Sequence, residues 1–306
     1  MKNKKIFLIG ANGRLGKKIC QKLYEEGLSF IPIVRKQSGL KNEIVCNFSI
    51  EELREILKKA DVIINTAGST KTYDKREMER GNVELVKNIV EAAPKNAKII
   101  HASSISVYGK MLAKKPADEQ TPIRPDSEYA KTKYEAEKIL SQNKNVVVLR
   151  IGTIYDESDD YVYIVKKIKE GKMYIIGNGN NRIPFVHIDD VASAFLAALK
   201  APPGVYNIVG DPITQKEAYQ IVSNVLGVKP PQKHIPFWLA NLYAFIEEKV
   251  SSIWGKKPKI TREHVAILFF DRVFDCSLAK EVLGFNPQKN ADGIKKVTET
   301  ILQKNL

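Results

Sequence analysis

A glycine-rich turn near the N-terminus is the feature that most constrains how this chain can fold. The motif GANGRLG at residues 10–16 follows a short apolar run and leads directly into a helical pattern. In a strand–turn–helix unit, the first glycine permits a tight turn, the second lets backbone amides approach a pyrophosphate, and the third lets the helix pack closely on the strand. The N-terminus of the helix adds free N–H groups and partial positive charge. We therefore expect a dinucleotide site rather than a merely structural turn, with cofactor contacts at Gly10, Asn12, Gly13, Arg14, Leu15 and Gly16.

The first 150 residues alternate short apolar runs with helical patterns. The runs lack a regular polar–apolar alternation, as expected of strands buried on both faces. They lie at residues 5–10, 30–34, 43–46, 61–65, 97–102 and 146–151. Between them, apolar residues share one helical face at residues 14–26 and again at residues 84–93. This alternation predicts a parallel sheet with helices on both sides.

After residue 151 the pattern loosens. A helix is expected at residues 190–199 with Asp189 as its N-cap, a strand at 205–209, and mostly helix over 236–306 with breaks near 256–259, 270–274 and 285–289. The fold class we predict is α/β, with a Rossmann-type doubly wound parallel sheet and a smaller, mixed, mostly helical C-terminal substrate region. Residues 1–150 would form the dinucleotide-binding domain, with later return segments near 189–209, and residues 151–306 would mainly bind the substrate.

Two cations follow the second predicted strand, where the adenine ribose of a dinucleotide should lie. Arg35 and Lys36 at this point would pair with a 2′-phosphate, and arginine can do so through two hydrogen bonds. Arg14, inside the glycine turn, could add a third cation. We therefore expect NADP(H) to be preferred and NAD(H) to be an alternative. Solvent-exposed charge after a strand is the simpler explanation of the same residues.

A serine, a tyrosine and a lysine form a second pattern. Tyr129 and Lys133 stand four residues apart on one face of a predicted helix, and Ser104 follows the fifth strand, at the sheet edge where ligands bind. A tyrosine with a pKa of about 10 is a poor base at pH 7. We expect the Lys133 ammonium to lower that pKa and to hold the nicotinamide ribose, and Ser104 to hydrogen-bond the reacting oxygen. The YxxxK spacing alone is weak evidence for catalysis. It becomes stronger evidence because the motif follows the glycine turn and the serine in the expected order.

These motifs together resemble the extended short-chain dehydrogenase/reductase family over nearly the whole chain. The similar segments are SSISVYG at 103–109, NTAG at 65–68, PFVHIDDV at 184–191, GVYNIVG at 204–210, DCSLA at 275–279 and LGFNP at 283–287. The resemblance implies that Ser104, Tyr129 and Lys133 are catalytic. It adds cofactor contacts at Asn47, Ala67, Gly68, Lys133 and Ile151, and substrate contacts at Ser106, Tyr108, Thr153 and Arg182.

The resemblance implies an NAD(P)-dependent oxidoreductase or epimerase that moves a hydride between nicotinamide and a hydroxyl or ketone carbon. A nucleotide sugar or a related small molecule would be the substrate. Thr153 and the long C-terminal helices favour instead an NADPH-dependent ketone reductase for a lipid-like substrate, similar to 3β-hydroxysteroid dehydrogenase and dihydroflavonol reductase. A non-catalytic NADP(H)-sensing protein is the alternative from another class, but such relatives typically lose the tyrosine or the lysine.

The chain is basic, with 49 Lys and Arg against 35 Asp and Glu and a net charge of +14. Such an excess favours anionic partners. No nucleic-acid-binding motif accompanies it, so we expect no nucleic acid to bind. The three cysteines, Cys20, Cys46 and Cys276, are widely spaced, which argues against a disulfide framework and for a reducing compartment. No CxxC or HxxxH spacing occurs, so we expect no metal site.

No apolar stretch reaches the length of a transmembrane helix, so a cytoplasmic protein is expected, and a homodimer is one arrangement it could adopt. The apolar segment 236–254 (PFWLANLYAFIEEKVSSIW) has helical spacing. It could border an apolar substrate, pack in a dimer, or lie on a membrane together with the lysine-rich run at 256–259. Ordinary core packing is the simplest interpretation.

Overall fold

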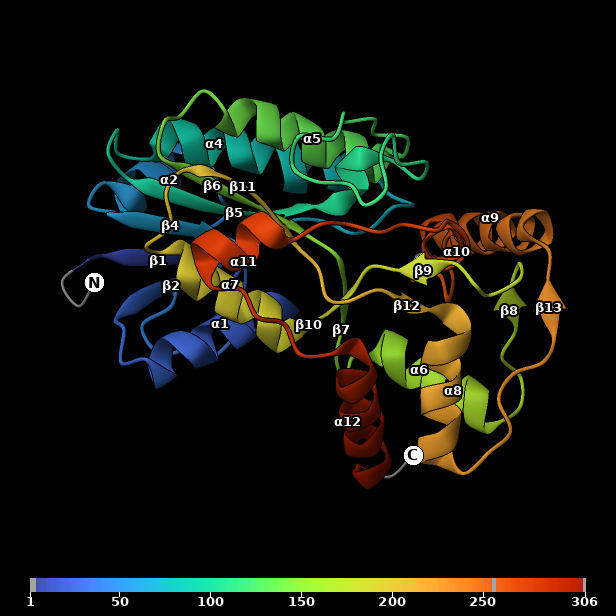
Figure 1. The fold of residues 1–306 in the computed structure, drawn as a ribbon. Coiled ribbons are helices and arrows are strands. Elements are labelled where there is room, and N and C mark those ends of the chain that lie inside the picture. The colour runs from blue at the N-terminus through green and yellow to red at the C-terminus, as the bar shows by residue number, and fades with distance from the viewer. Residues whose placement is uncertain (1–3, 255–256, 305–306) are drawn as a thin grey trace.

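A computed structural model describes residues 4–254 and 257–304 of the chain (Figure 1). At its centre is a seven-stranded sheet in the order β11-β6-β5-β4-β1-β2-β3, with every pair of neighbours parallel. The strands are β1 (Ile6–Ile9), β2 (Phe30–Val34), β3 (Ile44–Val45), β4 (Val62–Asn65), β5 (Lys98–Ser104), β6 (Val146–Ile151) and β11 (Gly204–Ile208). The strand order reverses between β1 and β4, and ligands bind at the carboxyl edge of such a switch point. The predicted Rossmann-type sheet is confirmed.

Helices cover both faces of this sheet (Figure 1). One layer contains α1 (Arg14–Glu25), α7 (Ile188–Ala198) and α11 (Ser277–Leu283), and the other contains α2 (Ile50–Leu57), α4 (Leu85–Ala92) and α5 (Glu128–Leu140). Successive side chains of a strand point to opposite layers: Leu8 belongs to the apolar cluster with α1 and α7, and Ile9 to the cluster with α2 and α4. Burial on both faces explains why these strands read as continuous apolar runs.

Most of the remaining elements form a smaller region beyond the carboxyl edge of the sheet (Figure 1). Helices α6 (Asp159–Lys169), α8 (Gln215–Leu226) and α12 (Asn290–Gln303) share one apolar cluster, and α9 (Phe237–Ile253) packs with α10 (Arg262–Phe269) in another. Short strand pairs connect them: β7 (Thr153–Tyr155) with β10 (Phe185–His187), β8 (Ile175–Ile176) with β13 (His234–Ile235), and β9 (Arg182–Ile183) with β12 (Ile213–Thr214). The mostly helical C-terminal part is therefore as predicted. No helix within the described residues is both long and apolar enough to cross a membrane.

One local prediction needs correction, and another is incomplete. The N-cap of α7 is His187 rather than Asp189, because the His187 ring nitrogen Nδ1 accepts the Asp189 backbone N–H at 3.2 Å. The chain returns to the sheet at α7 and β11, as expected for residues 189–209, and it does so once more further on. Helix α11 packs there too, since Ala279 and Leu283 belong to the same apolar cluster as α1 and α7.

Candidate active site

The glycine turn has the geometry that a dinucleotide requires. Gly10 has a φ of +82°, and a Cβ placed on it would lie 2.6 Å from the backbone nitrogen of Ala67. A Cβ on Gly16 would collide with the carbonyl oxygen of Gly10, so this glycine lets α1 pack against the end of β1. Gly13, the N-cap of α1, provides no side-chain cap, and no acidic residue lies in the first turn of the helix. The N–H groups of this helix end can therefore bind an anion such as a pyrophosphate.

Ser104, Tyr129 and Lys133 lie together at the carboxyl edge of the sheet. Helix α5 begins at Glu128 because the Ser127 hydroxyl caps the backbone N–H of Ala130 at 3.1 Å, which places Tyr129 in its first turn. Ser104 ends β5, and its hydroxyl hydrogen-bonds the Tyr129 phenol. The Lys133 Nζ lies 6.0 Å from the centre of the Tyr129 ring.

The electrostatics of this group differ from the sequence-based expectation. Desolvation raises the pKa of Tyr129 to about 12, although its hydrogen bond to Ser104 acts in the opposite direction. Burial also lowers the pKa of Lys133 to about 8. The Lys133 ammonium donates a 2.9 Å hydrogen bond to the carbonyl oxygen of Ala102 rather than to the phenol. The expected lowering of the tyrosine pKa by Lys133 is thus not found in this arrangement, because the cost of burying a phenolate is the larger effect.

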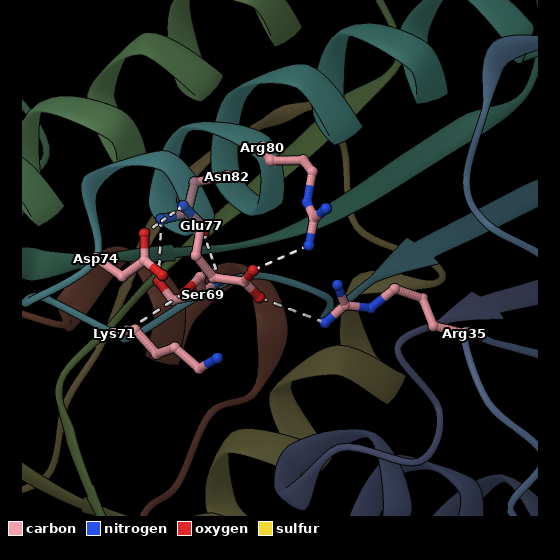
Figure 2. Close-up of polar contacts among 7 residues, drawn as sticks. All are labelled: Arg35, Ser69, Lys71, Asp74, Glu77, Arg80 and Asn82. Atoms are coloured by element: carbon pink, nitrogen blue, oxygen red, sulfur yellow. Dashed lines mark hydrogen bonds and ion pairs between the residues drawn. The ribbon is translucent and has the colours of Figure 1, made fainter. Parts of the chain in front are cut away.

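Gly68, predicted to contact the cofactor, and Asn82, which no sequence pattern singled out, lie together beside Lys133. A Cβ on Gly68 would lie 3.2 Å from Lys133 Nζ and 2.8 Å from Asn82 Oδ1, so only glycine leaves room for both groups. Asn82 accepts the Ser69 N–H at 2.8 Å and donates to the Ser69 carbonyl and to Thr132 Oγ1, each at 3.0 Å (Figure 2 shows Asn82 beside Ser69). It is carried by a π-helical turn, Arg80–Glu84, a feature common at functional sites. Asn82 therefore ties the loop after β4 to α5.

Another missed residue is His101, which lies in the interior of β5. Its Nδ1 is 3.1 Å from Asn65 Nδ2, and its Nε2 is buried without a hydrogen-bond partner among the described residues. Burial and the nearby Lys133 charge hold its pKa well below the ordinary value. His101 is therefore a neutral neighbour of the lysine and adds no charge to the site.

A buried ion pair connects the strands and the helix that carry the site residues. Arg150 NH2 lies 2.7 Å from Glu137 Oε2, and both side chains are almost fully buried. Glu137 also accepts a hydrogen bond from Ser103, the neighbour of Ser104. Tyr108 joins this network: its hydroxyl accepts from Arg150 at 2.8 Å and donates to Asn207 at 2.9 Å. Tyr108 is completely buried, so the structure does not support its predicted contact with substrate and gives it a packing role.

The expected adenosine end contains an ion cluster of Arg35, Glu77 and Arg80. Figure 2 shows the Glu77 carboxylate between the two guanidinium groups, 3.8 Å from Arg35 NH2 and 2.9 Å from Arg80 NH2. Glu77 belongs to the short helix α3 (Lys75–Glu79), which no sequence pattern singled out. Arg14 does not join this cluster; its Nε lies 3.4 Å from Asp156 Oδ2, so the predicted third cation is otherwise engaged.

Three of the predicted cofactor contacts are exposed side chains: Arg35, Lys36 and Asn47. The Asn47 side chain accepts the Ser49 N–H at 2.6 Å, so its carbonyl oxygen closes the turn before α2. Ile151 pairs with Ser104 in the β5–β6 register, which places it next to the serine hydroxyl. The carboxyl ends of the strands thus bring several of the predicted cofactor residues to one edge.

On the substrate side, the predicted arginine is paired, and a second arginine lies buried beside it. Arg182 makes a bidentate contact with Asp271, at 2.9 Å and 2.7 Å, so the structure does not support its expected role in binding diphosphate. Its neighbour Arg272 is buried, and its Nε has no hydrogen-bond partner among the described residues. The Ser106 hydroxyl is also buried and unpartnered within that part of the chain. Thr153, predicted to contact substrate, begins β7 and is partly buried.

Comparisons with known proteins agree with this geometry. Residues 6–209 match the family model described as "NAD dependent epimerase/dehydratase family". The chain therefore belongs to this family of enzymes, within the extended short-chain dehydrogenase/reductases.

Two curated relatives and one solved structure show the range of similar proteins. The N-acetyl-alpha-D-glucosaminyl-diphospho-ditrans,octacis-undecaprenol 4-epimerase of Escherichia coli O157:H7 is 26% identical, over 90% of this chain and 88% of that protein. The decarboxylating sterol-4-alpha-carboxylate 3-dehydrogenase of Mus musculus is also 26% identical, over 95% of this chain and 89% of its own. The UDP-glucuronic acid 4-epimerase from Bacillus cereus, solved in complex with NAD, has the same fold, with a TM-score of 0.74, 21% identity and coverage of 99% and 100%.

Proposed function

We propose that this enzyme transfers a hydride between a bound nicotinamide cofactor and a hydroxyl or ketone carbon of a sugar carried on a diphosphate. The observation that carries the proposal is the convergence of the Ser104 and Tyr129 hydroxyls and the Lys133 ammonium at the carboxyl edge of a Rossmann-type sheet. A cofactor fits this edge because the glycine turn and the uncapped start of α1 offer free N–H groups for its pyrophosphate. When bound, the nicotinamide supplies the hydride donor and acceptor.

The three side chains divide the proton chemistry. Tyr129, with a pKa of about 12, is a proton donor to the oxygen of a carbonyl that is being reduced. Ser104 hydrogen-bonds the same oxygen and fixes its position. Oxidation of a hydroxyl requires the phenolate instead, and an approach of the Lys133 ammonium to the phenol would favour that form. In an epimerisation both directions occur in sequence, and the hydride returns to the opposite face of the ketone.

A sugar carried on a diphosphate is supported by a relative and by one side chain. The similar protein from Escherichia coli is named for a sugar joined through a diphosphate to undecaprenol. Arg272 is buried, its Nε has no hydrogen-bond partner among the described residues, and it is the cation that we assign to a diphosphate oxygen. A ketone reductase acting on a lipid-like substrate is the second candidate, favoured by the sterol dehydrogenase relative and by Thr153 at the start of β7.

For the cofactor, we propose a preference for NADP(H) over NAD(H). Arg35 and Arg80 flank the Glu77 carboxylate, so a 2′-phosphate could replace it between two guanidinium groups. The family is named for NAD, and Glu77 is a carboxylate that could accept a hydrogen bond from a free 2′-hydroxyl. The Arg35–Glu77–Arg80 cluster therefore sets the balance between the two cofactors.

We further propose that the enzyme acts in the cytoplasm, as its three free cysteines, two of them buried, suit a reducing compartment. A homodimer stays a prediction.

The proposed function is tested by the cofactor that co-purifies and by turnover. Mass spectrometry identifies the nucleotide retained in the purified protein. The protein is then supplied with UDP-sugars and with ketones plus NADPH, and products are followed by NMR and by absorbance of the reduced nicotinamide. Interconversion of sugars supports the main proposal, and consumption of NADPH with ketones alone supports the second candidate. A protein that binds cofactor but turns over neither class contradicts both.

A further inference from the structure

Most large apolar residues of helix α9 lie outward, whereas two alanines and two polar residues lie inward. Its buried positions are Ala240, Ala244, Glu248 and Ser251, which follow one another at spacings of four, four and three and so form one face. The inward face meets α10 and the adjoining apolar cluster, to which Ala240 and Ala244 belong. The interpretation of this segment as ordinary core packing is therefore wrong for most of its side chains.

The opposite face of α9 is an exposed apolar stripe. Its members are Leu239, Leu242, Ile246, Val250 and Ile253, with Trp238, Tyr243, Phe245 and Trp254 beside them. Exposure reaches 66% at Trp238 and 82% at Ile253. The helix has 17 residues and so extends for about 25 Å. A contiguous apolar surface of this kind, rather than scattered single side chains, marks an interaction site.

The charges near this stripe are arranged asymmetrically. Glu248 is buried and paired with Arg262 at 2.8 Å, and Glu247 accepts the backbone N–H of Lys259 at 3.1 Å. Lys249 and Lys259 are exposed, and Lys249 Nζ lies over the Phe245 ring at 5.7 Å. Both acids of the helix thus have partners within the protein, and so does Lys257, which lies 2.7 Å from Asp160, whereas Lys249 and Lys259 are exposed. Lys256, part of the lysine run noted in the sequence, lies outside the described residues.

We propose that the outer face of α9 binds the surface of an anionic lipid bilayer. An apolar stripe with cations at its border complements acyl chains and anionic headgroups together. The tryptophans near both ends of the helix suit the headgroup region. A second copy of the chain fits less well, because an isologous contact would bring the same cations toward one another.

The apolar stripe of α9 is one helix away from the proposed catalytic residues. Helix α10 packs against α9 and carries Glu263, whose charge lies near enough to Tyr129 to affect its phenol. Glu263 is partly buried, and this burial raises its pKa. One helix therefore separates the proposed lipid surface from the catalytic tyrosine, a suitable arrangement for a substrate with a lipid tail. The binding itself does not depend on the proposed reaction.

The experiment uses the intrinsic fluorescence of the full chain, because its only two tryptophans are Trp238 and Trp254. The protein is mixed with vesicles of phosphatidylcholine alone or with phosphatidylglycerol, and emission and co-sedimentation are recorded at low and high salt. We expect a blue shift, quenching by brominated lipid, and binding at least tenfold tighter to the anionic vesicles at low salt. Unchanged emission and no co-sedimentation with either vesicle would overturn the proposal.

Two variants, each with a control, test which side chains bind the vesicles. The double variant Leu242→Ser/Ile246→Ser should lose binding to anionic vesicles at least tenfold, whereas Tyr24→Ser, at a half-exposed position on α1, should leave it unchanged. Lys249→Glu tests the charge without changing the apolar face, and Lys280→Glu on α11 is its control. Cofactor binding reports that each variant is folded. Dimerisation in sedimentation equilibrium that the double variant abolishes, without vesicle binding, would assign the stripe to a homodimer and refute the lipid proposal.

Discussion

Replacement of Arg35 by alanine should weaken NADPH binding and leave NADH binding nearly unchanged. In the structure, Arg35 NH2 lies 3.8 Å from Glu77, and its side chain is 54% exposed. Two unit charges at this distance attract by about 1 kcal/mol in water-like surroundings, and exposed pairs retain less. The ion pair with Glu77 is therefore a weak competitor for a 2′-phosphate.

The gain from the phosphate is larger than this competition. A hydrogen bond to a charged group contributes about 1.5–3 kcal/mol, and the exposure of Arg35 places it at the lower end of that range. A loss of about 1.5 kcal/mol corresponds to about a tenfold rise in the Kd for NADPH. Glu77→Gln should act in the opposite direction and tighten NADPH binding by about two- to fivefold, because it removes the competing carboxylate.

Fluorescence titration of NADPH and NADH against both variants measures these changes. Arg54→Ala, which removes an exposed arginine from α2, is the control for charge alone. An equal loss of affinity for the two cofactors in Arg35→Ala would refute the assignment of this residue to the 2′-phosphate.

Two further predictions concern the groups around Tyr129. Burial lowers the pKa of Lys133 from 10.5 to about 8, so the folded state binds fewer protons than the unfolded state between those values. Lys133 therefore lowers the free energy of unfolding at pH 7, and this penalty should shrink as the pH rises from 8 to about 10. Lys133→Met should accordingly stabilise the cofactor-free protein relative to wild type by about 2 kcal/mol at pH 7 and by less at pH 10. Urea denaturation that shows Lys133→Met to be less stable than wild type at pH 7 contradicts this. Glu137→Ala should destabilise the fold by about 3–5 kcal/mol, because it leaves Arg150 buried and unpaired. The control Glu135→Ala, on the same helix, breaks an exposed ion pair with Lys138 and should cost under about 1 kcal/mol. Equal losses of stability for the two variants in thermal denaturation would count against the importance of the buried pair.

The sheet could be predicted well from local pattern. Strands β2 and β6 have the bounds that their apolar runs indicate, because side chains buried on both faces leave an uninterrupted run. The catalytic set could also be proposed, since Tyr129 and Lys133 are related by one helical turn and Ser104 by the end of a strand. These relations are short in sequence and follow from the periods of helices and strands.

Contacts between distant segments could not be predicted in this way. Arg182 looked available for a substrate, yet its partner Asp271 is 89 residues away in the chain. Glu77 and Asn82 belong to no recognised motif, and their roles depend on how the loop after β4 folds against α5. Local pattern also indicated that α9 is a helix but not which face is buried, because Ala240 and Ala244 pack more closely than the larger apolar residues.

The pKa of Tyr129 is an instructive difference. The YxxxK spacing correctly placed an ammonium one turn from the phenol, but the sequence did not indicate how deeply the hydroxyl would be desolvated or that Lys133 would donate to Ala102. Desolvation depends on the whole surrounding packing, so its balance against a nearby charge requires the folded structure.

The most direct test of the account compares turnover by wild type, Tyr129→Phe and Tyr134→Phe, with the substrate class that the turnover assay selects. Tyr134, on the same helix, provides the matched loss of a hydroxyl. We predict that Tyr129→Phe lowers turnover at least about 100-fold while the Kd for the cofactor changes by less than about twofold, and that Tyr134→Phe behaves as wild type. A Tyr129→Phe enzyme that binds cofactor normally and retains most of its turnover would contradict the central role of this phenol.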